Sequence, residues 1–301
     1  MSRPKLFDGL MRPKVLFDTN AVRYFFGRDG FTEEELARLR ERVLRLAALD
    51  ELRVVLTTVV GWELTKFYFL PDFGPAQYER MQRFIVAAGS QWALKHEHRR
   101  RRLELQKRRK LRDVEVFDAC DVEVTVRMRC DPEEARRIFE MQKGLKDVER
   151  EKEARVRQAA VEGLAKNSPD WKASLDVDLS DGWDRMVKTF VKMEMRKVAR
   201  REGLRLAGWQ WPLPREVPTF WYAESFYAAK VRHVFVDSKK ELTSKKSLEA
   251  MPDMLDSVHF RDAAYVDCLV TQDAVFRDVG AGARVPLLMT SFDEFARMVL
   301  A

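Results

Sequence analysis

The sequence predicts an α/β fold in which helices flank a parallel sheet. Short apolar runs alternate with helical segments near both ends of the chain, as expected of strand–helix–strand units. Apolar residues make up 46 % of the 301 residues, which is enough for a sizeable core. The stretch between the two ends is mainly helical. We therefore expect one α/β domain, residues 1–73 and 215–301, interrupted by a basic helical insertion at residues 74–214.

The N-terminal elements follow from apolar patterning and from capping residues. The apolar run that ends at Asp18 predicts a buried strand that leads into a helix. Thr32 followed by Glu35 fits a capping box, and Pro71 predicts the end of a helix. In chain order we expect a strand at 14–17, a helix at 32–46, a strand at 52–58 and a helix at 59–70.

The insertion and the C-terminal part are read from the same signals. The alternation of apolar and polar residues around Val122 and Val124 predicts a β-hairpin within residues 114–128. Ser291 followed by Glu294 predicts a capped final helix. The other expected elements are helices at 131–164, 180–201, 217–234 and 252–265, a loop at 203–214, and strands at 268–271 and 285–289.

Positive charge is concentrated in one part of the chain. The formal net charge is +7, and ten of the eighteen residues from Lys95 to Arg112 are Lys or Arg. Such a run favours a polyanionic partner such as RNA, whose phosphates it would contact. A solvated arm or a protein-binding surface explains basic residues spread around a helix equally well. The candidate RNA-binding residues are Arg99, Arg100, Arg101, Arg102, Lys107, Arg108, Arg109 and Lys110.

The composition is that of a cytoplasmic protein. The three cysteines show no CxxC spacing and no even pairing, so neither a disulfide framework nor a zinc site is expected. The first fourteen residues lack the apolar run of a signal peptide, and no apolar window is long enough to cross a bilayer. We therefore expect a soluble cytoplasmic protein with no membrane partner.

Four acidic residues lie at or near the ends of the expected strands. Asp18 ends the first strand, Glu63 lies in the helix after the second, and Asp273 follows the strand at 268–271. Asp256 lies on the helix that leads into that strand. Since the carboxyl ends of parallel strands line one crevice, these carboxylates would repel one another unless a cation binds them. Oxygen ligands select Mg²⁺ or Mn²⁺ over zinc.

The same residues resemble the motifs of the PIN-domain nucleases. The segment Val15-Leu16-Phe17-Asp18-Thr19-Asn20 resembles their opening motif, and Thr57 followed six residues later by Glu63 resembles their second. The C-terminal stretch resembles the third and fourth motifs of a branch that reads Asp-x-x-His, Tyr-x-Asp and Thr-x-Asp. In this chain these are Asp256 and His259, Tyr265 and Asp267, and Thr271 and Asp273. The resemblance covers about residues 12–73 and 215–301.

This resemblance implies an endoribonuclease that hydrolyses phosphodiester bonds with a water activated by Mg²⁺ or Mn²⁺. It implies that four acids bind the metal and act in catalysis: Asp18, Glu63, Asp256 and Asp273. It also implies supporting roles for Asn20, Thr271 and His259. RNA is the expected partner and single-stranded DNA an alternative, and toxin, antiviral and RNA-processing roles all fit. Asp262 departs from the pattern, so we expect either a fifth acid near the site or a solvated helix position.

Several of these residues also have a simpler explanation. An Asp after a strand often caps the next helix, which would account for Asp18 and Asp273. His259 is equally well explained as a structural residue. A non-catalytic RNA-binding scaffold, a protein partner or inhibitor, and a homo-oligomer remain open alternatives. An aspartyl phosphotransferase is disfavoured, because Asn20 stands where that pattern has a second Asp.

Overall fold

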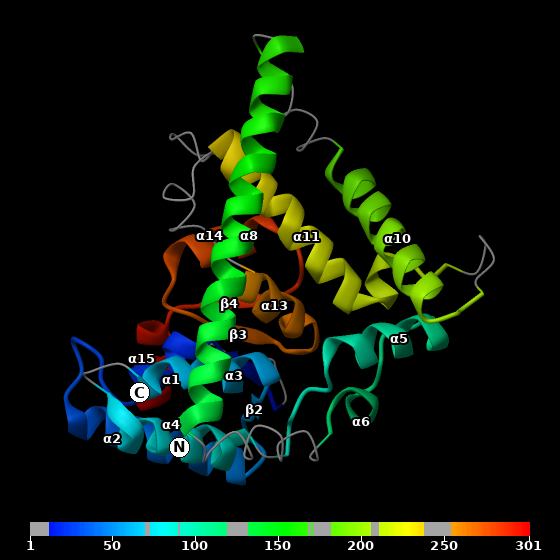
Figure 1. Cartoon of the computed structure of the whole chain (residues 1–301). Helices are drawn as coiled ribbons and strands as arrows, with labels where there is room; N and C mark the ends of the chain where they lie inside the picture. Colours follow the sequence, from blue (N-terminus) through cyan, green and yellow to red (C-terminus); the bar gives the residue numbers. More distant parts are fainter. Residues whose placement is uncertain are drawn as a thin grey trace.

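The computed structural model describes residues 12–69, 73–89, 91–118, 132–167, 170, 182–205, 211–237 and 254–301. Within them, four parallel strands form one sheet in the order β2-β1-β3-β4. The strands are β1 (Lys14–Phe17), β2 (Arg53–Val55), β3 (Cys268–Val270) and β4 (Leu288–Thr290). Helices flank this sheet (Figure 1), and the predicted fold class is therefore confirmed.

The strand register brings the two ends of the chain together. Leu16 of β1 pairs with Val55 of β2 on one side and with Leu269 of β3 on the other. All three side chains are buried, as is usual in a parallel sheet between layers of helices. The carboxyl ends of β1, β2 and β3 therefore lie along one edge of the sheet, where polar side chains that follow the strands can meet.

The helices connect and cover the strands. Those before residue 120 are α1 (Thr19–Tyr24), α2 (Glu33–Ala48), α3 (Thr58–Tyr68), α4 (Gly74–Gly89), α5 (Glu97–Lys107) and α6 (Asp113–Val116). Those in the middle are α8 (Pro132–Asn167), α10 (Trp183–Arg201), η3 (Pro214–Glu216), α11 (Pro218–Arg232) and the π-helical turn η4 (His233–Asp237). The last are α13 (Met254–Asp262), η5 (Ala263–Tyr265), α14 (Ala274–Gly282) and α15 (Phe292–Leu300).

Local sequence signals account for several helix starts. Thr32 accepts a hydrogen bond from the Glu35 backbone N–H while the Glu35 carboxylate accepts one from the Thr32 N–H, so the predicted capping box opens α2. Ser291 and Glu294 form the same box at the start of α15. Both predictions are confirmed, and so is the strand at 14–17.

Two strand predictions need correction. The last strand begins at Leu288, three residues later than expected, because Pro286 has no N–H to donate to β3. The hairpin predicted within 114–128 lies mostly outside the described residues. Its described part is helical in α6, and Phe117 forms only an isolated antiparallel bridge with Leu94.

The core of the α/β sheet extends into the segment expected to be an insertion. Tyr78 and Met81 of α4, and Val187 and Val191 of α10, are buried in the same cluster as the strand residues. Helix α4 packs against α2, α3 and β2. Residues 74–89 are therefore part of the sheet's own covering layer, whereas the origin of residues 74–214 as an insertion stays a prediction.

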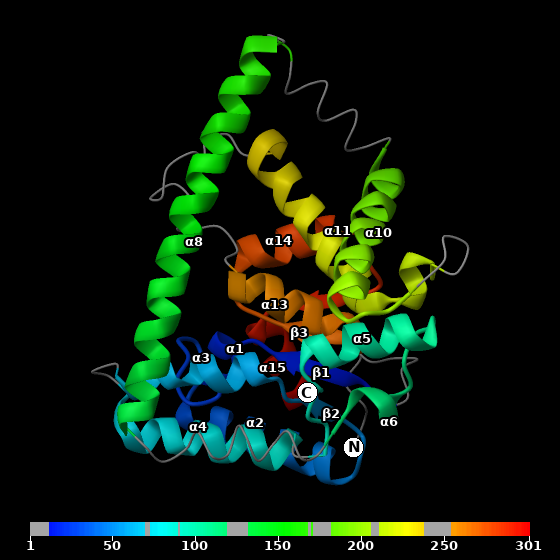
Figure 2. The same cartoon turned by 45° about the vertical axis from the view of Figure 1, so that its right-hand side comes forward.

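Helix α8 is the longest element of the described chain, at 36 residues. One end packs beside α3 at the edge of the sheet, and the other end extends away from it (Figures 1 and 2). Its residues are largely charged or polar, and across the described residues no helix is long and apolar enough to cross a membrane. Most α8 side chains whose burial is described are exposed, and the helix packs against α3 and, through Ala154, against Val234.

Candidate active site

Asp18 lies where β1 ends, with its side chain almost completely buried. Its Oδ1 accepts a hydrogen bond from the Ala21 N–H (2.6 Å), so Asp18 is the N-cap of α1. Its Oδ2 accepts a hydrogen bond from the Thr271 hydroxyl, at the end of the neighbouring strand β3. Asp18 therefore caps a helix, as the simpler explanation predicts, and it also lies at the carboxyl edge of the sheet, where the metal site is expected.

His259 is the basic side chain whose charge acts on the Asp18 carboxylate in the described structure. Burial raises the pKa of Asp18 above its ordinary value of 3.8, although the hydrogen bonds from Thr271 and Ala21 oppose the shift. The charge of Glu63 raises it further, and that of His259 lowers it. Among the described residues, no Lys or Arg forms an ion pair with Asp18. A cation bound beside this carboxylate would supply the missing positive charge.

Glu63 is the second buried acid of the site. Thr57 is the N-cap of α3, and the helix carries Glu63 back over the end of β1. There its Oε2 accepts hydrogen bonds from the Thr19 hydroxyl (2.6 Å) and from Nε2 of His259 (2.7 Å). Its Oε1 lies 3.3 Å from the Nζ of Lys146 on α8. Four segments of the chain thus converge on one carboxylate.

Glu63 and His259 form a buried ion pair. Burial disfavours the Glu63 carboxylate, but the hydrogen bond and the charge of His259 outweigh it and lower the pKa of Glu63 well below 4.5. Burial also disfavours the His259 imidazolium, but Glu63 outweighs it and raises the pKa of His259 above 6.5. Within the described structure, Nδ1 of His259 has no hydrogen-bond partner although it is buried. His259 is therefore held chiefly by the acid it supports.

The other predicted acids lie around this pair. Asp273 is exposed and caps α14 by accepting a hydrogen bond from the Phe276 N–H (2.8 Å), while its own N–H donates to the Thr271 hydroxyl (3.2 Å). Asp256 lies one turn before His259 on α13 and is close enough to raise the pKa of that histidine. Both acids therefore belong to the same edge of the sheet, but their contacts with Asp18 are indirect.

The predicted supporting residues differ in what they do. Thr271 is completely buried and links Asp18 to the backbone of Asp273. His259 supports Glu63, as described above. Asn20 is half-buried in the first turn of α1, and its side chain forms no hydrogen bond with another described residue. The structure therefore gives Thr271 and His259 clear contacts with the acids and gives Asn20 none.

The donor chemistry of this site fits a hard divalent cation. Two buried carboxylates, Asp18 and Glu63, supply oxygen ligands of the kind that Mg²⁺ and Mn²⁺ prefer. Asp256 and Asp273 add two further acids at the rim. In the described part of the chain, no three His, Cys, Asp or Glu side chains are packed tightly enough to form a metal site as they stand. The acids are gathered at one edge, but Lys146 and His259 neutralise Glu63 directly.

The predicted RNA-binding run is divided between buried and exposed side chains. Arg100 is completely buried, donates to the Lys95 carbonyl (2.9 Å) and forms an ion pair with Asp262. It has no access to a phosphate, which corrects its place among the RNA-binding candidates. Because Asp262 is buried and paired with Arg100, it is neither a fifth acid of the site nor a solvated helix position. Arg101 is half-buried and pairs with Glu97 at 2.8 Å.

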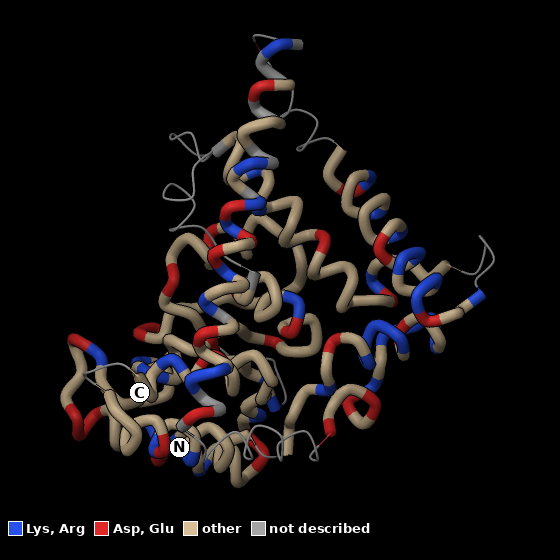
Figure 3. Tube along the Cα trace, in the orientation of Figure 1, with Lys and Arg blue, Asp and Glu red and all other residues tan. Residues whose placement is uncertain are grey.

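The rest of the run is partly neutralised. Glu115 forms ion pairs with Lys107 and, through both of its oxygens, with Arg109 (2.8 and 2.9 Å). Basic and acidic positions are mixed along this part of the chain (Figure 3). The candidates with exposed side chains outside the Glu115 cluster are Arg99, Arg102, Arg108 and Lys110.

Lys146 is the basic residue at the candidate site that sequence reasoning missed. It lies in a helix with many alternating charges, and its contact with Glu63 spans 83 residues. The sequence predicts that helix, at 131–164, but not which of its charged side chains contacts Glu63. Tyr265 and Asp267 of the family-like motif have structural contacts outside the site. Tyr265 donates to Glu104 (2.6 Å), and Asp267 accepts from the Lys14 N–H (2.8 Å).

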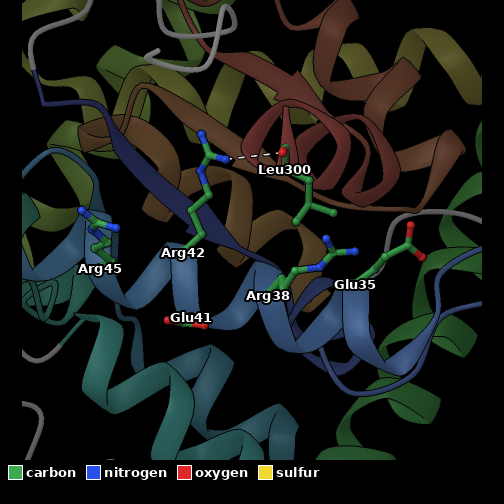
Figure 4. Close-up of a pocket in the computed structure, with 6 residues that line it drawn as sticks. All are labelled: Glu35, Arg38, Glu41, Arg42, Arg45 and Leu300. Carbon is green, nitrogen blue, oxygen red and sulfur yellow. Dashed lines mark hydrogen bonds between the residues drawn. The ribbon is translucent and has the colours of Figure 1, made fainter. Parts of the chain in front are cut away.

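A separate pocket of about 440 Å³ lies between α2 and the end of α15 (Figure 4). It is lined by Glu35, Arg38, Glu41, Arg42, Arg45 and Leu300. Arg42 donates to the Leu300 carbonyl (3.3 Å), and the remaining arginines are exposed side chains of one helix. None of these residues contacts the acids at the strand ends, so the pocket is not part of the candidate active site.

Comparisons with known proteins leave the site to be interpreted from its own chemistry. Searches against protein-family models, curated proteins and solved structures each found no match.

Proposed function

We propose that this protein is an Mg²⁺- or Mn²⁺-dependent nuclease of the PIN-like type, with RNA as its substrate. The observation that carries the proposal is the convergence of Asp18 and Glu63, from two different strand–helix junctions, on one buried edge of a parallel sheet. Helix capping accounts for Asp18 but not for Glu63, which lies inside α3 and is buried beside it. The order of Asp18, Glu63, Asp256 and Asp273 along the chain supports the same function through its resemblance to the family motifs.

The proposed chemistry is hydrolysis of a phosphodiester bond. Asp18 and Glu63 would hold the cation, with Asp256 and Asp273 at the rim, and a bound cation would supply a water of lowered pKa and stabilise the charge on the leaving oxygen. Thr271 and the Ala21 N–H fix the orientation of Asp18. Thr19 and His259 fix Oε2 of Glu63 in the same way, so both carboxylates are oriented before any ligand arrives.

A non-catalytic nucleic-acid-binding module is the second candidate. The observation that favours it is the neutralisation of Glu63 by both His259 and Lys146, since a carboxylate engaged in this way binds a cation less readily. Such a protein would bind RNA without cleaving it. Cleavage of single-stranded DNA is a variant of the first proposal and requires no different residues.

The test uses labelled pools of single-stranded RNA and DNA, each incubated with Mn²⁺ or with EDTA. We expect Mn²⁺-dependent cleavage of RNA by the wild type, and a loss of about 100-fold or more in Asp18→Asn, beyond the 10- to 100-fold typical of residues that only orient a ligand. Asn caps a helix as well as Asp does, so this variant should still fold.

The matched control is Asp278→Asn, which makes the same chemical change on the exposed surface of α14. It should cleave as the wild type does. Equal cleavage by Asp18→Asn and the wild type would refute the proposed site. RNA binding without cleavage under every condition would favour the non-catalytic module instead.

A further inference from the structure

Among the described contacts, helix α8 brings one ammonium group, that of Lys146, to the candidate active site. Lys146 lies 3.3 Å from Oε1 of Glu63, and its side chain is 27 % exposed, whereas that of Glu63 is 9 % exposed. The Lys146 side chain therefore crosses from the solvent-facing helix to the buried acid. By contrast, Leu145 just before it and Val148 two residues after it are exposed.

The two oxygens of Glu63 are used differently. Oε2 is fixed from inside the protein by Thr19 and His259, both of which are buried. Oε1 faces α8 and is reached by Lys146. The charge of Lys66, one turn along α3, also acts on Glu63 but makes no ion pair with it. Oε1 is therefore the oxygen that a cation would take, and Lys146 is the group that it would displace.

We propose that Lys146 is a substrate-binding residue of this site. Its ammonium group neutralises Glu63 while no divalent cation is bound, and it contacts a phosphate of the nucleic acid once the cation has taken that carboxylate. This inference rests on the proposed nuclease function. Electrostatic repulsion drives the exchange, since an ammonium group and a divalent cation on one carboxylate oxygen repel each other. The released lysine stays at the rim of the site because α8 remains packed against α3.

The proposal predicts two opposite effects of one substitution. Removing the charge with Lys146→Gln frees Oε1, so Mn²⁺ measured in the absence of RNA should bind about two- to fivefold more tightly, as expected for the loss of a partly exposed ion pair. With Ca²⁺ loaded to prevent turnover, the affinity for single-stranded RNA should fall. The slope of log affinity against log salt should decrease by about 0.7, the value for one phosphate contact on a single strand.

Three controls make the result specific. Lys152→Gln removes the same charge from an exposed position on the same helix and should leave both affinities unchanged. Lys146→Arg keeps the charge and should retain RNA binding. A melting temperature for each variant reports whether α8 is still folded, and a merely structural lysine would lower it without moving the two affinities in opposite directions.

The outcomes separate this inference from the proposed function. If Mn²⁺ binds the wild type but not Asp18→Asn, and Lys146→Gln changes neither affinity, the role of Lys146 is wrong and the nuclease proposal stands. If the wild type binds no Mn²⁺ at Asp18, both proposals fail. Tighter Mn²⁺ binding together with weaker RNA binding in Lys146→Gln supports both.

Discussion

At the scale of single residues, Glu104 of α5 is the most deeply buried acid that the structure describes outside the site. It is completely buried, and one oxygen, Oε1, accepts hydrogen bonds from the Thr219 N–H (3.1 Å), the Thr219 hydroxyl (2.6 Å) and the Tyr265 hydroxyl (2.6 Å). Its other oxygen has no partner among the described residues. Burial raises the pKa of Glu104 to about 6, although these hydrogen bonds and the charge of Arg100 oppose the shift.

This shift predicts a pH dependence of stability. Because the folded-state pKa of about 6 lies above the ordinary value of 4.5, the folded protein binds the proton more tightly than the unfolded chain does. The contribution to stability is fully present below pH 4.5 and is lost as the pH rises through 6. Glu104→Gln should remove this loss, which is about 2 kcal/mol for a shift of this size. Urea unfolding of both proteins at pH 5 and pH 8 measures it, and parallel profiles would contradict a raised pKa.

The sequence predicts the position of a single residue where a local pattern fixes it, but not which distant residue it pairs with. Asp18 and Glu63 could be predicted because each follows a strand, and parallel strands fix where such residues go. Arg100 and Asp262 are separated by 162 residues, and a run of four arginines gives no sign of which one turns inward. Burial of one charge against a distant partner is decided by packing, which local sequence patterns do not encode.

At the scale of elements, the packing of α4 on β2 depends on a glycine. A Cβ on Gly89, the last residue of α4, would lie 2.8 Å from the Val54 carbonyl oxygen and 2.7 Å from Cγ of Leu56. The carbonyl belongs to the β2 backbone and cannot move without disturbing its pairing with β1. Only a residue without a side chain allows the helix end to approach the strand this closely.

Gly89→Ala should therefore destabilise the protein by about 1–3 kcal/mol, the usual cost of overpacking. Gly144→Ala in α8 is the matched control, since nothing lies within 4 Å of its added Cβ. There the change should stabilise the helix by about 0.5–1 kcal/mol. Chemical denaturation of both variants tests the pair. A loss of stability in Gly144→Ala, or none in Gly89→Ala, would contradict this account of the packing.

Element positions were predicted more accurately than the packing between elements. The capping boxes of α2 and α15 and the strand β1 follow from residues close together in the chain, so their starts could be read directly. The close approach of α4 to β2 could not be predicted, because a glycine such as Gly89 is also common at the end of an ordinary helix. Sequence patterns accordingly place residues 74–89 in an insertion, whereas in the structure they pack in the same core as the sheet.

At the scale of the whole molecule, the net charge of +7 can act on RNA only through side chains that reach solvent. Replacing Arg99, Arg102 and Lys110 by Gln should weaken RNA binding. The slope of log affinity against log salt should also fall, by about 0.7 for each phosphate that these side chains neutralise. Replacing Arg38 and Arg45, exposed on α2 away from the acids, is the control (Figure 4). Fluorescence anisotropy measures the RNA affinity of the two variants. If both bind RNA equally well, the basic run is a solvated or protein-binding surface.

Helix α8 also has a mechanical consequence. Beyond Ala154, which packs with Val234, the helix continues for 13 residues to Asn167, or about 20 Å at 1.5 Å per residue. A tilt of about 10° of this rod would carry its far end about 3 to 4 Å. A pair of fluorophores, one of them near Asn167, would therefore report whether exchange of the ammonium group at Glu63 tilts the helix.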